Sequence, residues 1–353
     1  MFNCHAHLKA FHDDRVTLTE TMKQEMRSRR DANQKRLSKG LEKSEKPKPI
    51  EHVKQGSYAM HTMVQSEYAA SDIDDGAVFA KADLVGSRGG EYTPLDAKNM
   101  VRDAIDDGSF TKAPEVRSNC VRISYKDGFT IDIPVYRKIE KDDDTYFELA
   151  NADWRRSDPE GVNNWFKNQV KEKSPDSTNG RQMRRIVRLL KAWSKSRKSW
   201  NMPSGFILSK LTDEQYYKDM SLLGRDDKAL LQVMEGIHAR LQWDLVVKHP
   251  VVDGENITKS NEDANMVELR DRLGKAIDTL SILRKSDCAE LNALKALRDL
   301  FATDYFDQRI DKLEEEKKNS ENDSRSSAAY ILGGGTAPHS PVIKQGGERQ
   351  GYA

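Results

Sequence analysis

The sequence predicts an α+β protein in which a mixed α/β segment is followed by a mostly helical one. Two runs rich in β-branched and aromatic residues, 116–125 and 129–136, flank a Lys-Asp-Gly turn, which is a strong hairpin signal. Residues 71–79 predict a further strand, and residues 94–105 predict a helix with a proline in its first turn. From about residue 158 onward, apolar residues recur at helical spacing.

These patterns divide the 353 residues into four segments. Residues 1–49 predict one long polar helix, from about Thr17 to Lys39, and a proline-containing linker. Residues 50–157 form the expected α/β core, and residues 158–319 the expected helical lobe. Residues 320–353 are rich in Ser, Gly and polar residues, so we expect a flexible tail.

Composition narrows the class of protein without assigning it. The net charge is +1, so overall charge does not predict nucleic-acid binding. The three cysteines, Cys4, Cys120 and Cys288, have neither a disulfide nor a zinc spacing, which favours a reducing cytoplasm. No apolar run approaches the roughly 20 residues of a membrane span, and we expect no membrane partner.

Three acidic residues and a Gly-Ser turn carry the chemistry that the sequence predicts. Asp72 and Asp74 lie two apart on a predicted strand, so their side chains share one face. Asp132 interrupts a largely apolar strand, where a lone carboxylate is costly to bury without a partner. We therefore predict Asp72, Asp74 and Asp132 as catalytic metal ligands, because divalent cations relieve repulsion between clustered carboxylates.

The expected cofactor is Mg²⁺ in a two-metal site, with Mn²⁺ as an alternative. One metal would lower the pKa of an attacking hydroxyl, and Asp132 would hold that metal or accept the proton. The other would bridge a triphosphate and stabilise the leaving pyrophosphate. Gln55, Gly56 and Ser57 would meet the phosphates at the start of a short helix.

These residues together resemble the bacterial CD-NTase family, which are relatives of the animal cGAMP synthase. The motifs are Gln55-Gly56-Ser57, Asp72-Ile73-Asp74-Asp75-Gly76 and Ile131-Asp132-Ile133-Pro134. The likeness covers roughly residues 50–210 and is strongest to the group that contains the Vibrio dinucleotide cyclase. It implies a polymerase-β-like nucleotidyltransferase core with a helical second lobe. The implied activity is cyclisation of two or three NTPs, with ATP, GTP and a cGAMP-like product as candidates, in antiphage defence (CBASS).

The resemblance also implies nucleotide-binding roles for Arg122, Ser157, Lys191, Ser204 and Asp253. Each residue except Ser204 has a purely structural alternative. These are a surface ion pair for Arg122, a helix N-cap for Ser157, a solvated helix position for Lys191 and a plain turn for Asp253. Gly205 departs from the family pattern, in which a second serine follows Pro-Ser, and this leaves base preference and product open.

The C-terminus, Gly351-Tyr352-Ala353, resembles family tails that a ubiquitin-transfer-like protein conjugates through the terminal carboxylate, here that of Ala353. An ordinary frayed terminus is the alternative. The other expected partners are the NTP substrates and a downstream effector that binds the product. Nucleic acid is not required.

The sequence also allows two other functions. One is a nucleotidyltransferase that modifies RNA or another acceptor, for which the cations between Arg181 and Lys198 would supply a binding surface. The other is a catalytically inactive nucleotide-sensing module. The presence of Asp72, Asp74 and Asp132 argues against the inactive module.

Overall fold

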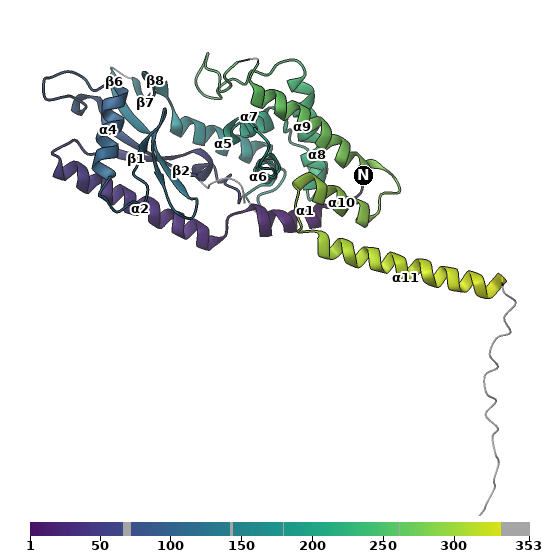
Figure 1. Ribbon diagram of the computed structural model, residues 1–353. Coiled ribbons are helices and arrows are strands. Elements are labelled where there is room, and N and C mark those ends of the chain that lie inside the picture. The colour runs from purple at the N-terminus through teal and green to yellow at the C-terminus, as the bar shows by residue number, and fades with distance from the viewer. Residues whose placement is uncertain (66–71, 142–143, 179, 261, 333–353) are drawn as a thin grey trace, which may run out of the picture. The chain divides into compact units, whose positions relative to one another are not determined.

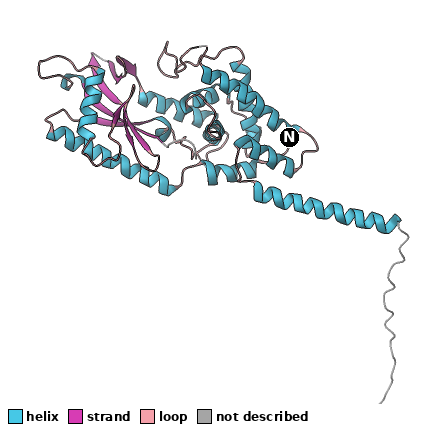
Figure 2. Cartoon of the chain, viewed as in Figure 1, coloured by secondary structure: helices cyan, strands magenta, loops and turns pink. Residues whose placement is uncertain are grey.

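The computed structural model describes all residues except 66–71, 142–143, 179, 261 and 333–353. Two compact units are separated along the chain, Met1–Phe306 and Asp307–Ala353. Within the first unit, strands gather in one region and helices make up the rest (Figures 1 and 2). The α+β fold class predicted from the sequence is confirmed.

A single mixed sheet forms the scaffold of the first unit. Its path is β3-β4-β5-β2-β6-β7-β8, and β1 pairs with β2 off this path. The strands are β1 (Glu51–Gln55), β2 (Asp72–Ala80), β3 (Glu115–Val116), β4 (Val121–Ser124), β5 (Thr130–Ile133), β6 (Val135–Lys141), β7 (Asp144–Ala150) and β8 (Trp154–Ser157).

The single strand predicted over residues 129–136 is divided into β5 and the start of β6, which continues to Lys141. Asp72 to Asp74 of β2 pair in parallel with β5, and Ala77 to Ala80 pair in the same register with β6. Pro134 separates the halves because it has no N–H for the ladder. Its carbonyl still accepts a hydrogen bond from Ala77 N at 2.8 Å, so the register of the two halves against β2 is continuous.

Alternation along β2 places the acidic pair opposite the main core. Ile73, Ala77 and Phe79 pack in the large core with α2 (Glu20–Lys43) and α4 (Pro94–Ile105). Asp72 and Asp74 lie on the other face, because successive side chains alternate. Asp75 faces α2, where its carboxylate accepts two hydrogen bonds from Gln34.

Helix α2 differs from the predicted helix at both ends. It begins after the N-cap Thr19, whose side chain accepts from Met22 N, and it continues past Gly40 to Lys43. Gly40 is required by a close approach, since a Cβ there would lie 1.7 Å from the carbonyl oxygen of Ala104 in α4. The glycine thus lets two helices touch and does not end one.

The helices of the second lobe follow the sheet, and the N-terminus packs among them. Asp226 N donates to His5 Nδ1 at 3.1 Å, and the rings of Phe11 and Phe301 lie 4.7 Å apart. The remaining helices of the first unit are α1 (His5–Phe11), the π-helix η1 (His12–Val16), α3 (Gly56–Ala59), η2 (Lys81–Asp83), α5 (Pro159–Lys173), α6 (Gln182–Ser194), α7 (Gly205–Gln215), η3 (Met220–Leu222), α8 (Asp226–Leu241), α9 (Ala264–Leu280), η4 (Ser281–Arg284) and α10 (Glu290–Phe301).

The second unit contains α11 (Asp307–Leu332). The helix continues beyond residue 320, into the segment for which the sequence predicts a flexible tail. Its charged residues repeat at i,i+4, as in Lys312–Glu316 and Lys317–Glu321, which supports a solvated helix. The predicted conjugation residue, Ala353, lies outside the described residues. None of the helices in the described part of the chain is both long and apolar enough to span a membrane.

Candidate active site

A cavity of about 610 Å³ brings together most of the predicted site residues. Its lining includes side chains from β1, β2, β8, α6 and α7 and from the loop around residues 249–257. The predicted residues on its wall are Gln55, Gly56, Ser57, Asp72, Asp74, Ser157, Lys191 and Ser204. Arg122, Asp132 and Asp253, although described by the structure, are not among the lining residues.

The Gly-Ser turn lies directly against the acidic strand. Gln55 pairs with Asp74 across β1 and β2, and Gly56 follows with a φ of +64°. A Cβ at Gly56 would lie 2.0 Å from Asp74 Oδ2. Both the backbone conformation and the space therefore require glycine, and the turn can approach the carboxylate only without a side chain.

Asp72 and Asp74 form a partly exposed acidic pair at the cavity wall. Burial, followed by repulsion from Asp132 and Asp72, raises the pKa of Asp74 to about 7, while the cations Arg122 and Lys191 partly offset this. Thr130 donates its hydroxyl to Asp72 Oδ1. Clustered negative charge with a raised pKa is the environment that a divalent cation would stabilise.

Asp132 is in register with Asp74, but its carboxylate is held by Arg122. The two Arg122 bonds to Asp132, from Nε and Nη2, measure 2.7 and 2.6 Å, as expected for cross-strand neighbours on β4 and β5. Among the residues that the structure describes, no group of at least three His, Cys, Asp or Glu side chains is arranged to hold a metal ion. Asp72 and Asp74 suit a cation as they stand, whereas Asp132 is engaged by an arginine.

Lys191 lines the same cavity as the two aspartates and carries the opposite charge. It is buried, and its ammonium donates to Thr62 O at 2.7 Å and to Thr62 Oγ1 at 3.2 Å. Burial and the neighbouring cations Lys195 and Arg188 lower the pKa of Lys191 to about 7. The predicted alternative of a solvated helix position is therefore wrong for Lys191.

Gly205 makes room for this lysine. A Cβ at Gly205 would lie 2.5 Å from Lys191 Cε and 3.0 Å from its Nζ. The departure from the family pattern thus has a structural consequence: a serine at this position would displace the lysine. Ser204 caps α7 by accepting from Ile207 N at 3.4 Å.

Of two further residues predicted to bind nucleotide, Ser157 lines the cavity and Asp253 does not. Ser157 ends β8 and lines the cavity, but the N-cap of α5 is Asp158, which accepts from Gly161 N at 2.7 Å. The helix-cap alternative for Ser157 is therefore wrong. Asp253 lies in the loop whose neighbours Val252 and Glu255 line the cavity.

Several cavity residues were not predicted from the sequence. The buried Tyr136 donates its hydroxyl to Gln55 Oε1 at 2.7 Å, which orients the residue before the turn. Phe206 and His249 add an aromatic wall, with ring centroids 5.7 Å apart. Arg155 pairs with Glu255, joining β8 to the 249–257 loop. Two of these places had a sequence signal: Phe206 follows the Pro-Ser-Gly segment already singled out, and the segment from His249 to Asn256 resembles one in the family.

The fold is similar to that of solved CD-NTase structures. Residues 50–136 match the family described as "Cyclic GMP-AMP synthase DncV-like, nucleotidyltransferase domain". The matched segment runs from just before β1 into β6 and carries the Gly56 turn, Asp72, Asp74 and Asp132.

One sequence relative and two solved structures illustrate the similarity. A cyclic GMP-AMP synthase of Escherichia albertii is 28% identical over 220 residues, which are 60% of this chain and 46% of that protein. The match thus spans about half the length of the relative. The Bradyrhizobium diazoefficiens CD-NTase CdnG in complex with GTP has a TM-score of 0.67 at 14% identity, over 88% of this chain and 99% of that one. Vibrio cholerae DncV cyclic AMP-GMP synthase has a TM-score of 0.66 at 17% identity, over 85% and 96%.

Proposed function

We propose that this protein is a cyclic di- or oligonucleotide synthase that joins NTPs and releases pyrophosphate. The observation that carries the proposal is the cavity in which the Gly56 turn, the Asp72/Asp74 pair and the buried Lys191 converge. A triphosphate needs such an arrangement, because its charge must be matched by backbone N–H groups, a cation and metal ions.

The residues of this chain divide the work by position. The turn at Gly56 and Ser57 offers N–H groups and a hydroxyl to the phosphates, and glycine keeps the turn close to Asp74. Lys191 has one N–H left after its two bonds to Thr62, and this N–H is available for a phosphate oxygen. Phe206 and His249 provide aromatic surfaces for a base.

Asp72 and Asp74 would hold Mg²⁺. Asp132 would join them as a ligand if its carboxylate bound the metal and Arg122 at the same time. When bound, the metal would stabilise charge on the triphosphate and lower the pKa of the attacking hydroxyl. The role of Arg122 is then that of a counter-ion which holds Asp132 on the site face of the sheet.

ATP and GTP are the substrates we propose. Vibrio cholerae DncV has been solved with the linear intermediate 5′ pppA(3′,5′)pG, and CdnG with GTP. This chain has Gly205 where the family pattern has a serine, and this difference changes the cavity near Lys191. The assay below therefore includes all four NTPs.

The test is synthesis with purified protein. Labelled ATP, GTP, CTP and UTP, singly and in pairs, are incubated with Mg²⁺ or Mn²⁺, digested with phosphatase and separated. We expect a phosphatase-resistant product that is lost in the Asp72→Ala/Asp74→Ala variant. Absence of any such product with every NTP pair and either metal would contradict the proposal.

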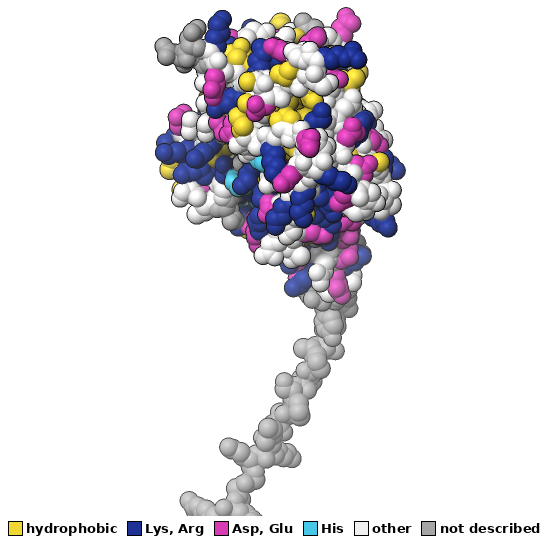
Figure 3. Space-filling view, turned by 90° about the vertical axis from the view of Figure 1, so that its left-hand side faces the viewer, with side chains coloured by type: hydrophobic (Ala, Val, Ile, Leu, Met, Phe, Trp, Pro, Cys, Tyr) yellow, Lys and Arg dark blue, Asp and Glu magenta, His cyan; other side chains and the backbone are white. Residues whose placement is uncertain are grey.

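An RNA-modifying transferase is the second candidate, and the structure disfavours its predicted surface. Arg185 and Lys191 are buried, and Arg185 pairs with Asp226 through bonds of 2.6 and 2.9 Å. On the face displayed in Figure 3, Lys and Arg side chains stand among Asp and Glu side chains. Linear tails on added RNA in the same assay would favour this candidate.

The cellular role we propose is antiphage signalling through the cyclic product and a downstream effector. We also propose that a ubiquitin-transfer-like partner conjugates the Ala353 carboxylate. The support is the match of residues 50–136 to the DncV-like family model and the Gly351-Tyr352-Ala353 ending. Mass spectrometry of the tagged protein from cells, with a variant lacking the last three residues as control, would test the conjugation.

A further inference from the structure

Residues 60–62, which follow the Gly-Ser turn, are bonded back to that turn through their N–H groups. Met60 N donates to Gly56 O at 3.1 Å, and His61 N donates to Tyr58 O at 3.2 Å. Thr62 N donates to Ser57 O at 2.8 Å. The position of residues 60–62 therefore fixes the position of the turn.

The carbonyl groups of the same three residues are bonded to helix α6. Arg184 Nε donates to Met60 O at 3.0 Å. Arg188 donates to His61 O through Nε at 2.9 Å and Nη2 at 2.6 Å, and Lys191 Nζ donates to Thr62 O at 2.7 Å. Positions 184, 188 and 191 are spaced i, i+4 and i+7, so they lie on one face of the helix. The carbonyls of three successive residues thus meet three cations on one face of α6.

Placing cations against backbone carbonyls costs folding free energy, because the cations lose hydration and the carbonyls offer no full negative charge in return. Packing alone therefore does not explain why arginines occupy these positions. A carbonyl oxygen carries only partial charge, so its bond does not neutralise a guanidinium. Burial, followed by repulsion from Arg184 and Arg185, lowers the pKa of Arg188 to about 10. His61 also adopts a φ of +54°, a conformation uncommon outside glycine, at the residue that Arg188 holds.

We propose that Arg184 and Arg188 are positioning residues that set the Gly56–Ser57 turn against Asp72 and Asp74. They act through the 60–62 segment and do not touch the reacting atoms. Lys191 has both roles: it donates a hydrogen bond to Thr62 of the 60–62 segment, and it lines the active-site cavity. The link to catalysis rests on the proposed function, whereas the link between α6 and the turn rests on the hydrogen bonds alone.

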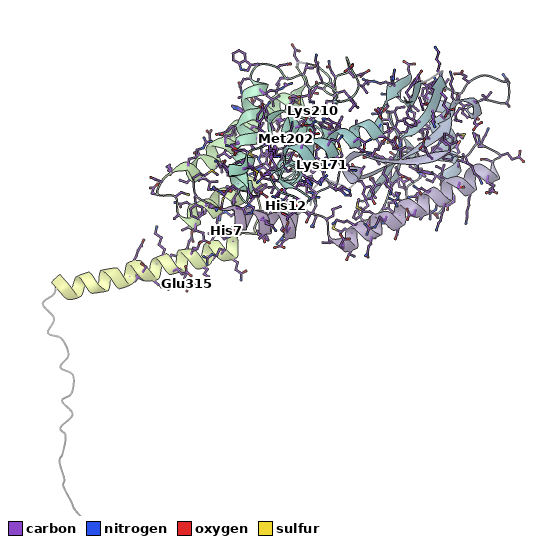
Figure 4. All side chains as sticks on the ribbon, turned by 180° about the vertical axis from the view of Figure 1, so that it is seen from behind. His7, His12, Lys171, Met202, Lys210 and Glu315 are labelled. Atoms are coloured by element: carbon purple, nitrogen blue, oxygen red, sulfur yellow. The ribbon has the colours of Figure 1, made fainter. Side chains whose placement is uncertain are left out.

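Substitution of these arginines is feasible because both border a second cavity, of about 970 Å³. His12 of η1, labelled in Figure 4, lines the same cavity. A shorter or apolar side chain there would not overpack the core. Arg188→Met removes the donors and the charge, and Arg188→Lys keeps the charge and a donor. Arg181→Met is a matched control, because Arg181 also donates to a backbone carbonyl, that of Asp176 at 3.1 Å, but not to residues 60–62.

The experiment compares amide hydrogen exchange and kinetics across these variants. We expect Arg188→Met to speed exchange at residues 60–62 by about tenfold or more, with strands β2 and β5 unchanged. It should lower kcat by roughly 10- to 100-fold, as expected when a reacting group is misplaced, with KM changed much less. Arg188→Lys should restore part of both effects, and Arg181→Met should show neither.

Unchanged exchange at residues 60–62 in Arg188→Met would overturn the proposal. So would an equal rise of exchange throughout the sheet, or the same behaviour in Arg181→Met, because these are the marks of a general loss of stability. Exchange is measured without NTPs or metal. If the wild-type protein makes no cyclic product, the proposed function fails while the exchange data still decide the positioning role.

Discussion

At the scale of single residues, Gly56 has the most demanding position in the site. Its φ is positive, and a Cβ would overlap with Asp74 Oδ2. We predict that Gly56→Ala lowers synthesis by at least about tenfold, because the turn or the carboxylate must move. Gly89→Ala is a matched control, since Gly89 also has a positive φ, of +82°, but nothing lies near its missing Cβ.

Initial rates at saturating NTP, together with thermal unfolding, check this prediction. Both variants should lose about 1 kcal/mol from the backbone conformation alone. Only Gly56→Ala should lose activity. Equal activity in the two variants would show that the turn need not lie against Asp74.

Lys191 gives the fold a pH dependence of known sign. Its pKa is lowered by burial to about 7, whereas a lysine in an unfolded chain has a pKa of about 10.4. Between these values the unfolded chain binds more protons, so the free energy of unfolding should rise with pH, by at most about 1.4 kcal/mol per pH unit. The raised pKa of Asp74, about 7, acts only below this window.

Urea unfolding between pH 7 and pH 9.5 measures the effect. The rise with pH should be smaller in Lys191→Met, where burial still lowers the pKa of Lys195, and unchanged in Lys171→Met, which substitutes an exposed lysine. An equal slope in wild type and Lys191→Met would mean that Lys191 keeps an ordinary pKa in the folded protein.

At the scale of elements, Lys98 ties helix α4 to the segments that follow strands β3 and β7. It is buried, and its ammonium donates to the carbonyls of Arg117, Ser118 and Asn151 at 3.2, 2.7 and 3.2 Å. We predict that Lys98→Met lowers the free energy of unfolding by about 2 kcal/mol, because three carbonyls lose a charged partner that is itself buried.

Chemical denaturation checks this value, with Lys112→Met as the control. Lys112 is mostly exposed and pairs with Glu115, so its substitution should change stability by less than about 0.5 kcal/mol. Similar effects for the two variants would show that Lys98 does not hold these elements together.

Elements that follow local rules were predictable from the sequence. Helix α4 begins at Pro94 with a capping box between Thr93 and Asp96, both encoded locally. The alternation that put Asp72 and Asp74 on one face and Asp75 on the other is likewise a local property. What could not be predicted depends on contacts between distant segments. The register that joins Arg122 to Asp132, and the approach of α4 that requires Gly40, are fixed by packing.

At the scale of the whole molecule, the site joins sheet and helices within the first unit. The sheet supplies the turn and the carboxylates, and α6 and α7 supply Lys191 and Ser204. Arg155 of β8 and Glu255 of the 249–257 loop join the two sets across the cavity. A cavity with walls from both the sheet and the helices suits a reaction in which two nucleotides are held together.

The measurement that tests the central claim most directly is the ratio of pyrophosphate released to nucleotide incorporated. A ring has as many phosphodiester bonds as nucleotides, so cyclic synthesis gives one pyrophosphate per nucleotide. A linear dinucleotide gives half as much. We predict a ratio of one for the wild-type protein with its preferred NTPs and no added RNA acceptor, and no pyrophosphate from Asp72→Ala/Asp74→Ala. A ratio near one half, or undiminished release by the double variant, would contradict cyclic nucleotide synthesis at this site.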